Sequence, residues 1–288
     1  MRRHTSRFTL RWPLRKSWAI AFLFSLLFLS YTTRAQLIDN DESKLYAESK
    51  QVNQFIRRFN GEEDEKGNRY YASDKLFQSP KLRKKYLDVL FDESNKGISA
   101  ALRSEFSKLV MDKPLFLDFH GGSWFSEVQT TFSLNGKDQP VTLFMELEKD
   151  HLGSKWVIQK VYTQMFSSSF ARDTVKIGRF LHPMSHELDF MNLRKVFENR
   201  DSVSQFTSKS FTPDYLSVFL YEVKKGNLKF KTVDQVKFHF FQIHGWYFEL
   251  AEFNRPGYNT GWLISSLVKL TSDADKNLLR RYIYNENR

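Results

Sequence analysis

Residues 124–136 read WFSEVQTTFSLNG, an alternation of apolar and polar side chains that ends in the pair Asn135-Gly136. A period of two predicts a β-strand with one buried face, and Asn-Gly favours a tight hairpin turn. Residues 141–147 (VTLFMEL) alternate in the same way and would form the return strand. With a third apolar stretch at 156–166 (WVIQKVYTQMF), the pattern predicts an antiparallel meander.

The segment before this meander has the spacing of helices. Apolar residues recur at i, i+3, i+4 and i+7, which places Val52, Phe55, Ile56 and Phe59 on one face of a helix. Ser79-Pro80 favours the start of a second helix that reaches residue 91, and a third is expected at 98–110. Helices followed by a strand meander predict an α+β fold in which the helices cover one face of the sheet.

The same order recurs in the second half of the chain. A helix is expected at 188–197, and Thr212-Pro213-Asp214 would open another. Strands are expected at 228–233, 236–243, 246–253 and 262–270, with His244-Gly245 at a hairpin position. Trp156 and Trp262 hold the same place at the start of the last strand of each meander. We therefore predict two copies of one unit, an imperfect repeat because the second copy lacks a counterpart of the helix at 79–91.

This order of elements resembles the nuclear-transport-factor-two-like (cystatin-like α+β) fold, a cone of three helices wrapped by a strongly bent sheet. The first copy, residues 45–169, carries the resemblance through its helices and through WFSEVQTTFSLNG and SKWVIQKVY, whereas the second copy, 186–271, carries it less well. The resemblance implies two cones, joined by a linker at 170–185. Such pairs are similar to uncharacterised exported proteins of Bacteroidetes. The fold hosts enzymes, ligand binders and interaction modules, so it does not by itself select a function.

The first 35 residues have the layout of a secretory signal peptide. Basic residues between Arg2 and Lys16 precede the apolar run AIAFLFSLLFLS, and small residues up to Ala35 offer a cleavage site. The run is shorter than the roughly 20 apolar residues that span a bilayer, although an uncleaved N-terminal anchor is an alternative. Residues 36–44 would then form a flexible mature N-terminus, and 272–288 a C-terminal helix or tail. We expect an exported protein of the periplasm, the outer envelope or the medium, with no transmembrane span after signal removal.

Charge and cysteine content exclude several classes of protein. The net charge is +11, but residues 1–35 hold seven basic residues and no acid, so the mature chain carries +4. Its Lys and Arg alternate with acids, which argues against a nucleic-acid surface. The absence of cysteine excludes disulfides, thiol catalysis and zinc–thiolate sites. His182 and His186 lie four apart, but Pro183 interrupts a helix between them, so we expect neither a metal nor a cofactor.

Two hypotheses for the function remain. The first is a non-catalytic envelope protein that binds an unknown protein or a small hydrophobic ligand. The second is a hydrolase or isomerase with an acid–base group in a cone-shaped pocket, drawn from Asp118, His120 and His239. A solvated turn at His120-Gly121-Gly122 and a packed histidine in Phe238–Phe241 explain these residues more simply than catalysis does. The inward positions of the first sheet are apolar, which favours the first hypothesis: Trp124, Val128, Phe132, Val141, Leu143, Met145 and Leu147.

The second meander is apolar on both faces and needs cover on both. Helices would cover one face. The other would be covered by the sheet of the first copy, by a partner protein or by a hydrophobic ligand. The residues assigned to that interface are Phe241, Ile243, Tyr247 and Phe253. The sequence favours the first copy, which makes the chain a monomer with an internal pseudo-dimer, because tandem copies commonly pack as homodimers do.

Two short motifs resemble an O-glycosylation acceptor. Asp173-Thr174-Val175 and Asp201-Ser202-Val203 match the Asp-Ser/Thr-aliphatic pattern used in Bacteroidetes envelopes. One chance occurrence of so short a pattern is expected in a chain of this length. Both motifs lie near the predicted linker and helix ends, where exposure is expected, so Thr174 and Ser202 are candidate modification sites.

Overall fold

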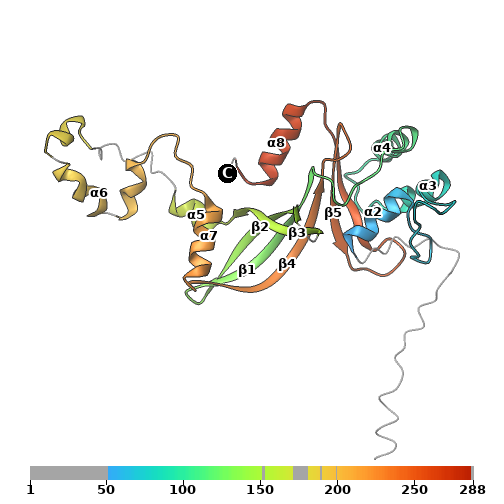
Figure 1. Ribbon diagram of the computed structural model, residues 1–288, viewed down its shortest axis with the longest axis horizontal. Helices are drawn as coiled ribbons and strands as arrows, with labels where there is room; N and C mark the ends of the chain where they lie inside the picture. The colour runs from blue at the N-terminus through green and yellow to red at the C-terminus, as the bar shows by residue number, and fades with distance from the viewer. Residues whose placement is uncertain (1–50, 151–152, 171–180, 189, 199, 287–288) are drawn as a thin grey trace, which may run out of the picture. The chain divides into compact units, whose positions relative to one another are not determined.

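The computed structural model describes residues 51–150, 153–170, 181–188, 190–198 and 200–286 (Figure 1). In these ranges seven α-helices accompany one open antiparallel sheet of six strands, in the order β3-β2-β1-β4-β5-β6. The predicted α+β class is confirmed. The predicted signal peptide, the mature N-terminus at 36–44 and Thr174 lie outside the described residues.

The sheet is built from two meanders and the helices that flank them. The strands are β1 Trp124–Leu134, β2 Lys137–Asp150, β3 Gly153–Tyr162, β4 Leu228–Phe240, β5 Trp246–Phe253 and β6 Gly261–Lys269. The α-helices are α2 Val52–Asn60, α3 Pro80–Val89, α4 Ala100–Asp112, α5 Gln164–Ser169, α6 Arg194–Glu198, α7 Tyr215–Lys224 and α8 Asp273–Ile283. The 3₁₀-helices are η2 Pro183–Leu188, η3 Met191–Leu193 and η4 Arg200–Phe206.

Local sequence signals account for several element boundaries. Asn135 and Gly136 take positive φ values of 52° and 79°, as the hairpin between β1 and β2 requires. Asp214 caps α7, because its side chain accepts a hydrogen bond from the Leu216 amide. The helix expected at 188–197 is instead split into short turns. Phe190 takes a positive φ of 55°, which interrupts a right-handed helix at that point.

The two strands expected at 228–233 and 236–243 are one long strand, β4, that ends at Phe240. Its pairing with β1 shifts between Gln129 and Thr130, which leaves Asp234 as a bulge residue. The Thr131 hydroxyl donates a hydrogen bond to the Asp234 carboxylate at 2.7 Å. Asp234, which in the sequence suggests a break between two strands, therefore forms a bulge within one strand.

The two meanders join edge to edge rather than face to face. β1 pairs antiparallel with β4 over eleven residue pairs, from Trp124↔Phe240 to Leu134↔Leu228. The expected packing of one sheet against the face of another is therefore not present in the described residues; the halves share one sheet. This pairing satisfies the backbone groups of two strands that would otherwise be exposed edges.

Three apolar clusters form the core. The main cluster lies between α2–α4 and β4–β6 and includes Trp124 of β1, while a second, with Phe132 of β1, packs against α5 and α7. Because β1 pairs regularly with β2, Trp124 and Phe132 lie on the same face of the sheet. Phe125 lies on the opposite face, in a third cluster that the residues of α8 cover. One face therefore carries helices at both ends of β1, and the other carries α8.

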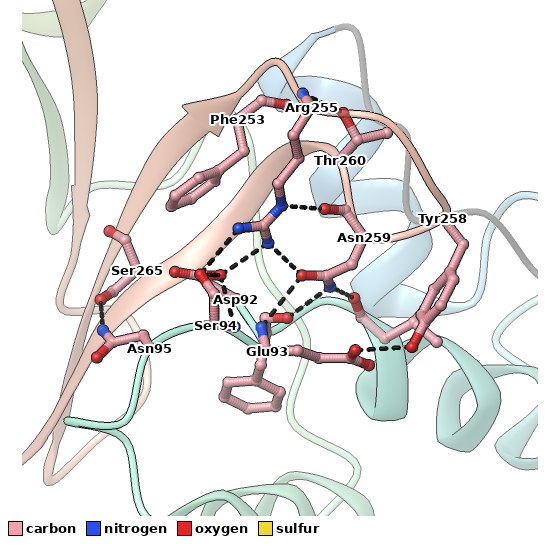
Figure 2. Close-up of polar contacts among 12 residues, drawn as sticks. Asp92, Glu93, Ser94, Asn95, Phe253, Arg255, Tyr258, Asn259, Thr260 and Ser265 are labelled. Carbon is pink, nitrogen blue, oxygen red and sulfur yellow. Dashed lines mark hydrogen bonds and ion pairs between the residues drawn. The ribbon is translucent and has the colours of Figure 1, made fainter.

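A polar network covers the outer edge of β6 (Figure 2). The Asp92 amide donates to the Ile264 carbonyl at 3.0 Å, and the Ile264 amide donates to the Leu90 carbonyl at 2.9 Å. The buried Asn259 side chain donates to the Phe91 carbonyl at 2.8 Å, and Arg255 pairs with Asp92 at 2.7 Å. The segment between α3 and α4 is thus held along β6, whereas in the described residues β3 pairs only with β2.

Candidate functional site

An apolar groove of about 400 Å³ crosses the face of the sheet that carries α2–α4 and α7. Val128 lies in its floor, halfway along β1 between Trp124, which packs with the α2–α4 cluster, and Phe132, which packs with α7. The groove therefore occupies the part of this face between the two helix groups. Its lining comprises Gln51, Val52, Asn53, Phe119, Ser126, Val128, Met145, Trp156, Val236 and Phe238.

The apolar side chains of the groove remain partly open. Val128, Met145 and Val236 are half-buried, and Trp156 at the β3 end is 38% exposed. From the apolar inward positions of β1 and β2, side chains would be expected to fill the first cone. In the described residues they do so only at the ends of the strands, because helices pack there and not over the centre. Contiguous apolar surface of this kind marks ligand or partner sites in soluble proteins.

The polar end of the groove contains an unpaired acceptor. Asn53 Oδ1 is buried, and none of the described residues gives it a hydrogen-bond partner. Asn53 lines both the groove and a neighbouring polar cavity of about 410 Å³. Ser126, also at this end, makes only a 3.5 Å contact with the Met145 carbonyl oxygen. Buried polar groups are nearly always hydrogen-bonded, so the Asn53 oxygen needs an explanation.

The opposite face of the sheet carries a buried polar triad, which we define as Glu127, His239 and Tyr247. His239 Nε2 lies 3.0 Å from Glu127 Oε2, and His239 Nδ1 lies 2.9 Å from the Tyr247 hydroxyl. Gln129 donates to the other Glu127 oxygen at 2.9 Å. His239 is 1% exposed and its ring lies against Phe125, with 4.9 Å between ring centroids.

Burial and hydrogen bonding set the protonation of the triad. Burial raises the pKa of Tyr247, so its hydroxyl stays protonated. Burial also acts to raise the pKa of Glu127, but hydrogen bonds from His239 and Gln129 outweigh it and hold that pKa below its usual range. The triad lies on the other side of the sheet from the groove; His239 and Tyr247 are buried there, and Glu127 is partly exposed. In this arrangement His239 has no access to a substrate in the groove.

His120 and Asp118, the other residues of the acid–base hypothesis, lie in an exposed loop. The Asp118 carboxylate accepts a hydrogen bond from the His120 backbone amide at 2.9 Å, and the His120 ring lies 3.1 Å from the Ser154 hydroxyl. Both residues line the polar cavity near Asn53. Their side chains do not join His239, so the structure does not bring the three residues together. A side chain at Gly121 would meet Asp118 at 3.0 Å, which accounts for that glycine.

The four residues assigned to the internal interface do not share one face. Phe241 and Tyr247 are buried in the cluster under α8, and Ile243 belongs to the main core on the other side. Phe253 is half-buried and packs its ring 4.8 Å from the Arg255 guanidinium carbon. The alternation expected up to residue 243 ends earlier, because β4 stops at Phe240. The cover for this side comes from α8 rather than from a second sheet.

The remaining candidate residues lie apart from the groove. Ser202 is part of η4. His182 and His186 bond locally, to the Met184 amide and the Pro183 carbonyl. Within the ranges given above, no three His, Asp or Glu side chains gather at metal-binding distance. Every helix in the same ranges is too short or too polar to cross a lipid bilayer.

Comparisons with protein-family models, with curated proteins and with solved structures give no match to this chain. The sequence alternation identified the apolar inward positions of β1 and β2, but it did not predict a groove there, nor the contribution of Asn53 and Val236. Glu127 was likewise missed, since it reads as an exposed position of a strand and meets His239 only through the pairing of β1 with β4.

Proposed function

We propose that the protein is an exported, non-catalytic binding module that holds a small apolar ligand in the groove at the centre of its sheet. The groove supports this because its volume of about 400 Å³ and its mostly apolar lining suit a small molecule. Small-molecule sites usually have volumes of roughly 300–1,000 Å³ and few polar groups. The signal-peptide layout of residues 1–35 supports export to the envelope or the medium.

The polar end of the groove favours a ligand with one hydrogen-bond donor. Asn53 Oδ1 lacks a partner, and a hydroxyl or amide group of the ligand would supply one. The body of the ligand would lie on Val128, Met145 and Val236 toward Trp156. An amphipathic molecule with an apolar body and a single donor head meets both requirements.

We also propose that the two halves are copies of the nuclear-transport-factor-two-like fold. Helices α2–α4 precede the first meander and α7 precedes the second, as tandem copies would require. Trp156 and Trp262 lie near the start of the last strand in each half. In this interpretation the groove lies on the inner face of the first bent sheet and of the adjoining strand β4, where the helices of one complete cone would close it.

A pair of valine substitutions on β4 tests the groove. Val236→Glu places a carboxylate in the groove, whereas Val233→Glu changes a valine that is 49% exposed and outside it. Titration with the apolar dye anilinonaphthalene sulfonate should show affinity reduced roughly tenfold or more in Val236→Glu, a loss of at least about 1.4 kcal/mol. Val233→Glu should bind as the unmodified protein does. Equal dye binding by the two variants, at matched circular dichroism, would rule out the groove as the site.

A further inference from the structure

The strand β3 is an open edge of the sheet. In the described residues its only strand neighbour is β2, whereas the opposite edge, β6, is covered by the segment around Asp92. An edge strand presents a row of unpaired N–H and C=O groups to any chain that can pair with it. Among the strands that the structure describes, one sheet edge is therefore covered and the other, β3, has no strand paired to it.

The register identifies which residues of β3 direct their backbone groups outward. Successive residues of an antiparallel strand bond alternately to the two neighbouring strands. The two-residue turn at Asn135-Gly136 makes Leu134 and Lys137 a hydrogen-bonded pair, so odd-numbered residues of β2 bond β1 and even-numbered ones bond β3. Two side-chain hydrogen bonds agree with this assignment. Thr130 of β1 donates to the Val141 carbonyl, and Thr163, which follows β3, donates to the Pro140 carbonyl.

The partners of the even-numbered β2 residues are therefore the inward residues of β3. Glu146 pairs with Val157 and Glu148 with Lys155. The residues between and beside them, Ser154, Trp156 and Ile158, direct their N–H and C=O groups away from the sheet. A bulge at Gln159 ends this regular run. The free edge is about five residues long, a common strand length.

A cleft of about 860 Å³ borders the part of β3 that follows this run. Four consecutive residues, Gln159–Tyr162, line it, although neighbouring side chains of a strand point to opposite faces. Glu146 of β2 also lines it, so the cleft follows the β3 edge and extends onto the face that α8 covers. Its walls are Thr212–Leu216 at the start of α7 and, at the end of α8 and just beyond, Arg280, Arg281, Tyr284, Asn285 and Glu286.

We propose that the open edge of β3 binds an extended peptide of another protein as an additional strand. The two walls leave room for a single chain, whereas a second copy of β3 would bring its own walls into the same space. Two cations of the cleft are already paired, Arg280 with Glu146 and Lys160 with Glu286, and Asp214 caps α7, so the cleft does not select a strongly charged partner. Backbone pairing would supply the affinity, and alternate side chains the specificity.

The two faces of β3 indicate the sequence pattern of the peptide. Trp156 and Ile158 lie on the face that carries the apolar groove, because they pair with Leu147 and Met145. Lys155 lies on the other face. A bound strand would place every second side chain beside Trp156 and the others beside polar groups. The peptide should therefore alternate apolar and polar residues.

Selection with displayed random peptides tests the proposal on the mature protein. Peptides about ten residues long, the upper range for strands, serve as the probe. The enriched peptides should alternate apolar and polar residues, and on binding they should slow hydrogen exchange at the Trp156 and Ile158 amides. The amides of Lys155 and Val157, already bonded to β2, should change little.

Ser154→Pro removes an outward N–H group and adds a ring where the peptide would lie, while Ser154→Ala keeps the N–H group. Affinity should fall roughly tenfold in the proline variant and stay unchanged in the alanine variant. Failure to enrich any peptide, or equal binding by the two variants, would overturn the proposal. So would a dimer of the unmodified protein that Ser154→Pro dissociates, because a second copy would then occupy the edge. Dye binding in the groove should be unaffected by Ser154→Pro, so the two proposals fail independently.

Discussion

Glu127, His239 and Tyr247 show how a polar group is accommodated inside this sheet. Both ring nitrogens of the buried His239 lie within hydrogen-bonding distance of a partner. An unpaired polar group at such a site would cost about 1–3 kcal/mol. We interpret the triad as a polar contact that holds β1, β4 and β5 in register beneath α8. A structural role of this kind predicts effects on stability rather than on ligand binding.

Glu127→Gln should lower the free energy of unfolding by about 1 kcal/mol at neutral pH, because a neutral amide replaces a charge-assisted partner of His239. The folded-state pKa of Glu127 is depressed below its usual 4.5. Its contribution is therefore fully present above the unfolded pKa and is lost as pH falls through the lower folded pKa. Urea unfolding measured from pH 7 to pH 3 should show the difference between the two proteins shrinking at the acid end.

The matched control is Glu252→Gln, which changes an exposed glutamate on the neighbouring strand β5. Its free energy of unfolding should stay within about 0.5 kcal/mol of the unmodified protein, as for most surface substitutions. A Glu127→Gln difference that persists undiminished at pH 3 would contradict the assignment of the effect to the carboxylate.

Helix α8 is the element that covers the triad. Ser272 caps its first turn by accepting a hydrogen bond from the Asp275 amide, and Leu279, Ile283 and Tyr284 pack on the cluster around Phe125. Arg280 lies over the rings of Phe125, Phe241 and Tyr284. No residue of α8 is itself fully buried. The helix is therefore attached by one apolar stripe and should be separable from the sheet.

Two adjacent leucines of α8 test this attachment. Leu279→Asp places a charge at a half-buried position of the apolar stripe and should lower the free energy of unfolding by about 1–3 kcal/mol, because the leucine contacts are lost and the charge is partly desolvated. Leu278 is 60% exposed, and Leu278→Asp should leave the melting temperature almost unchanged. Proteolysis should cut the chain near Thr271 faster in the first variant only. Equal melting temperatures would show that α8 does not need the stripe to stay docked.

At the scale of the whole molecule, the predicted signal peptide makes a prediction about the mature chain and its compartment. Cleavage after Ala35 should leave a mature chain that begins at Gln36 and has lost the basic N-terminal segment. N-terminal sequencing of protein fractionated from the producing cell measures this directly. Ala35→Glu should block processing, because signal cleavage requires a small residue there, whereas Ala35→Gly should be processed. An intact Met1 on cytoplasmic protein would refute export.

Joining the halves through β1 and β4 has a consequence for the whole molecule. One continuous sheet leaves two edges where separate meanders would leave four, and the segment around Asp92 covers one of the two. The helices gather at the ends of one face, so its centre is left as the groove. The groove is thus a product of the assembly, because β4 completes its floor beside β1 and β2, whereas β3 would be an edge strand in the first half alone.

The sequence alone determined the elements that short-range chemistry specifies. Asn135-Gly136 allows the positive φ angles of a hairpin, Asp214 caps α7, and the period of two identified which side chains of β1 share a face. These signals operate within a few residues, so they can be read without knowing the neighbours. They were sufficient for the α+β class.

Only the tertiary structure decided which elements meet. Alternation predicts the buried face of a strand but not its neighbour, so the pairing of β1 with β4 and the cover by α8 could not be read from periodicity. Glu127 and His239 are 112 residues apart, and their contact follows from that pairing. The groove is open because helices pack only at its ends. Such sites depend on contacts between residues that are far apart in the sequence. These contacts leave no local sequence pattern from which the site could be predicted.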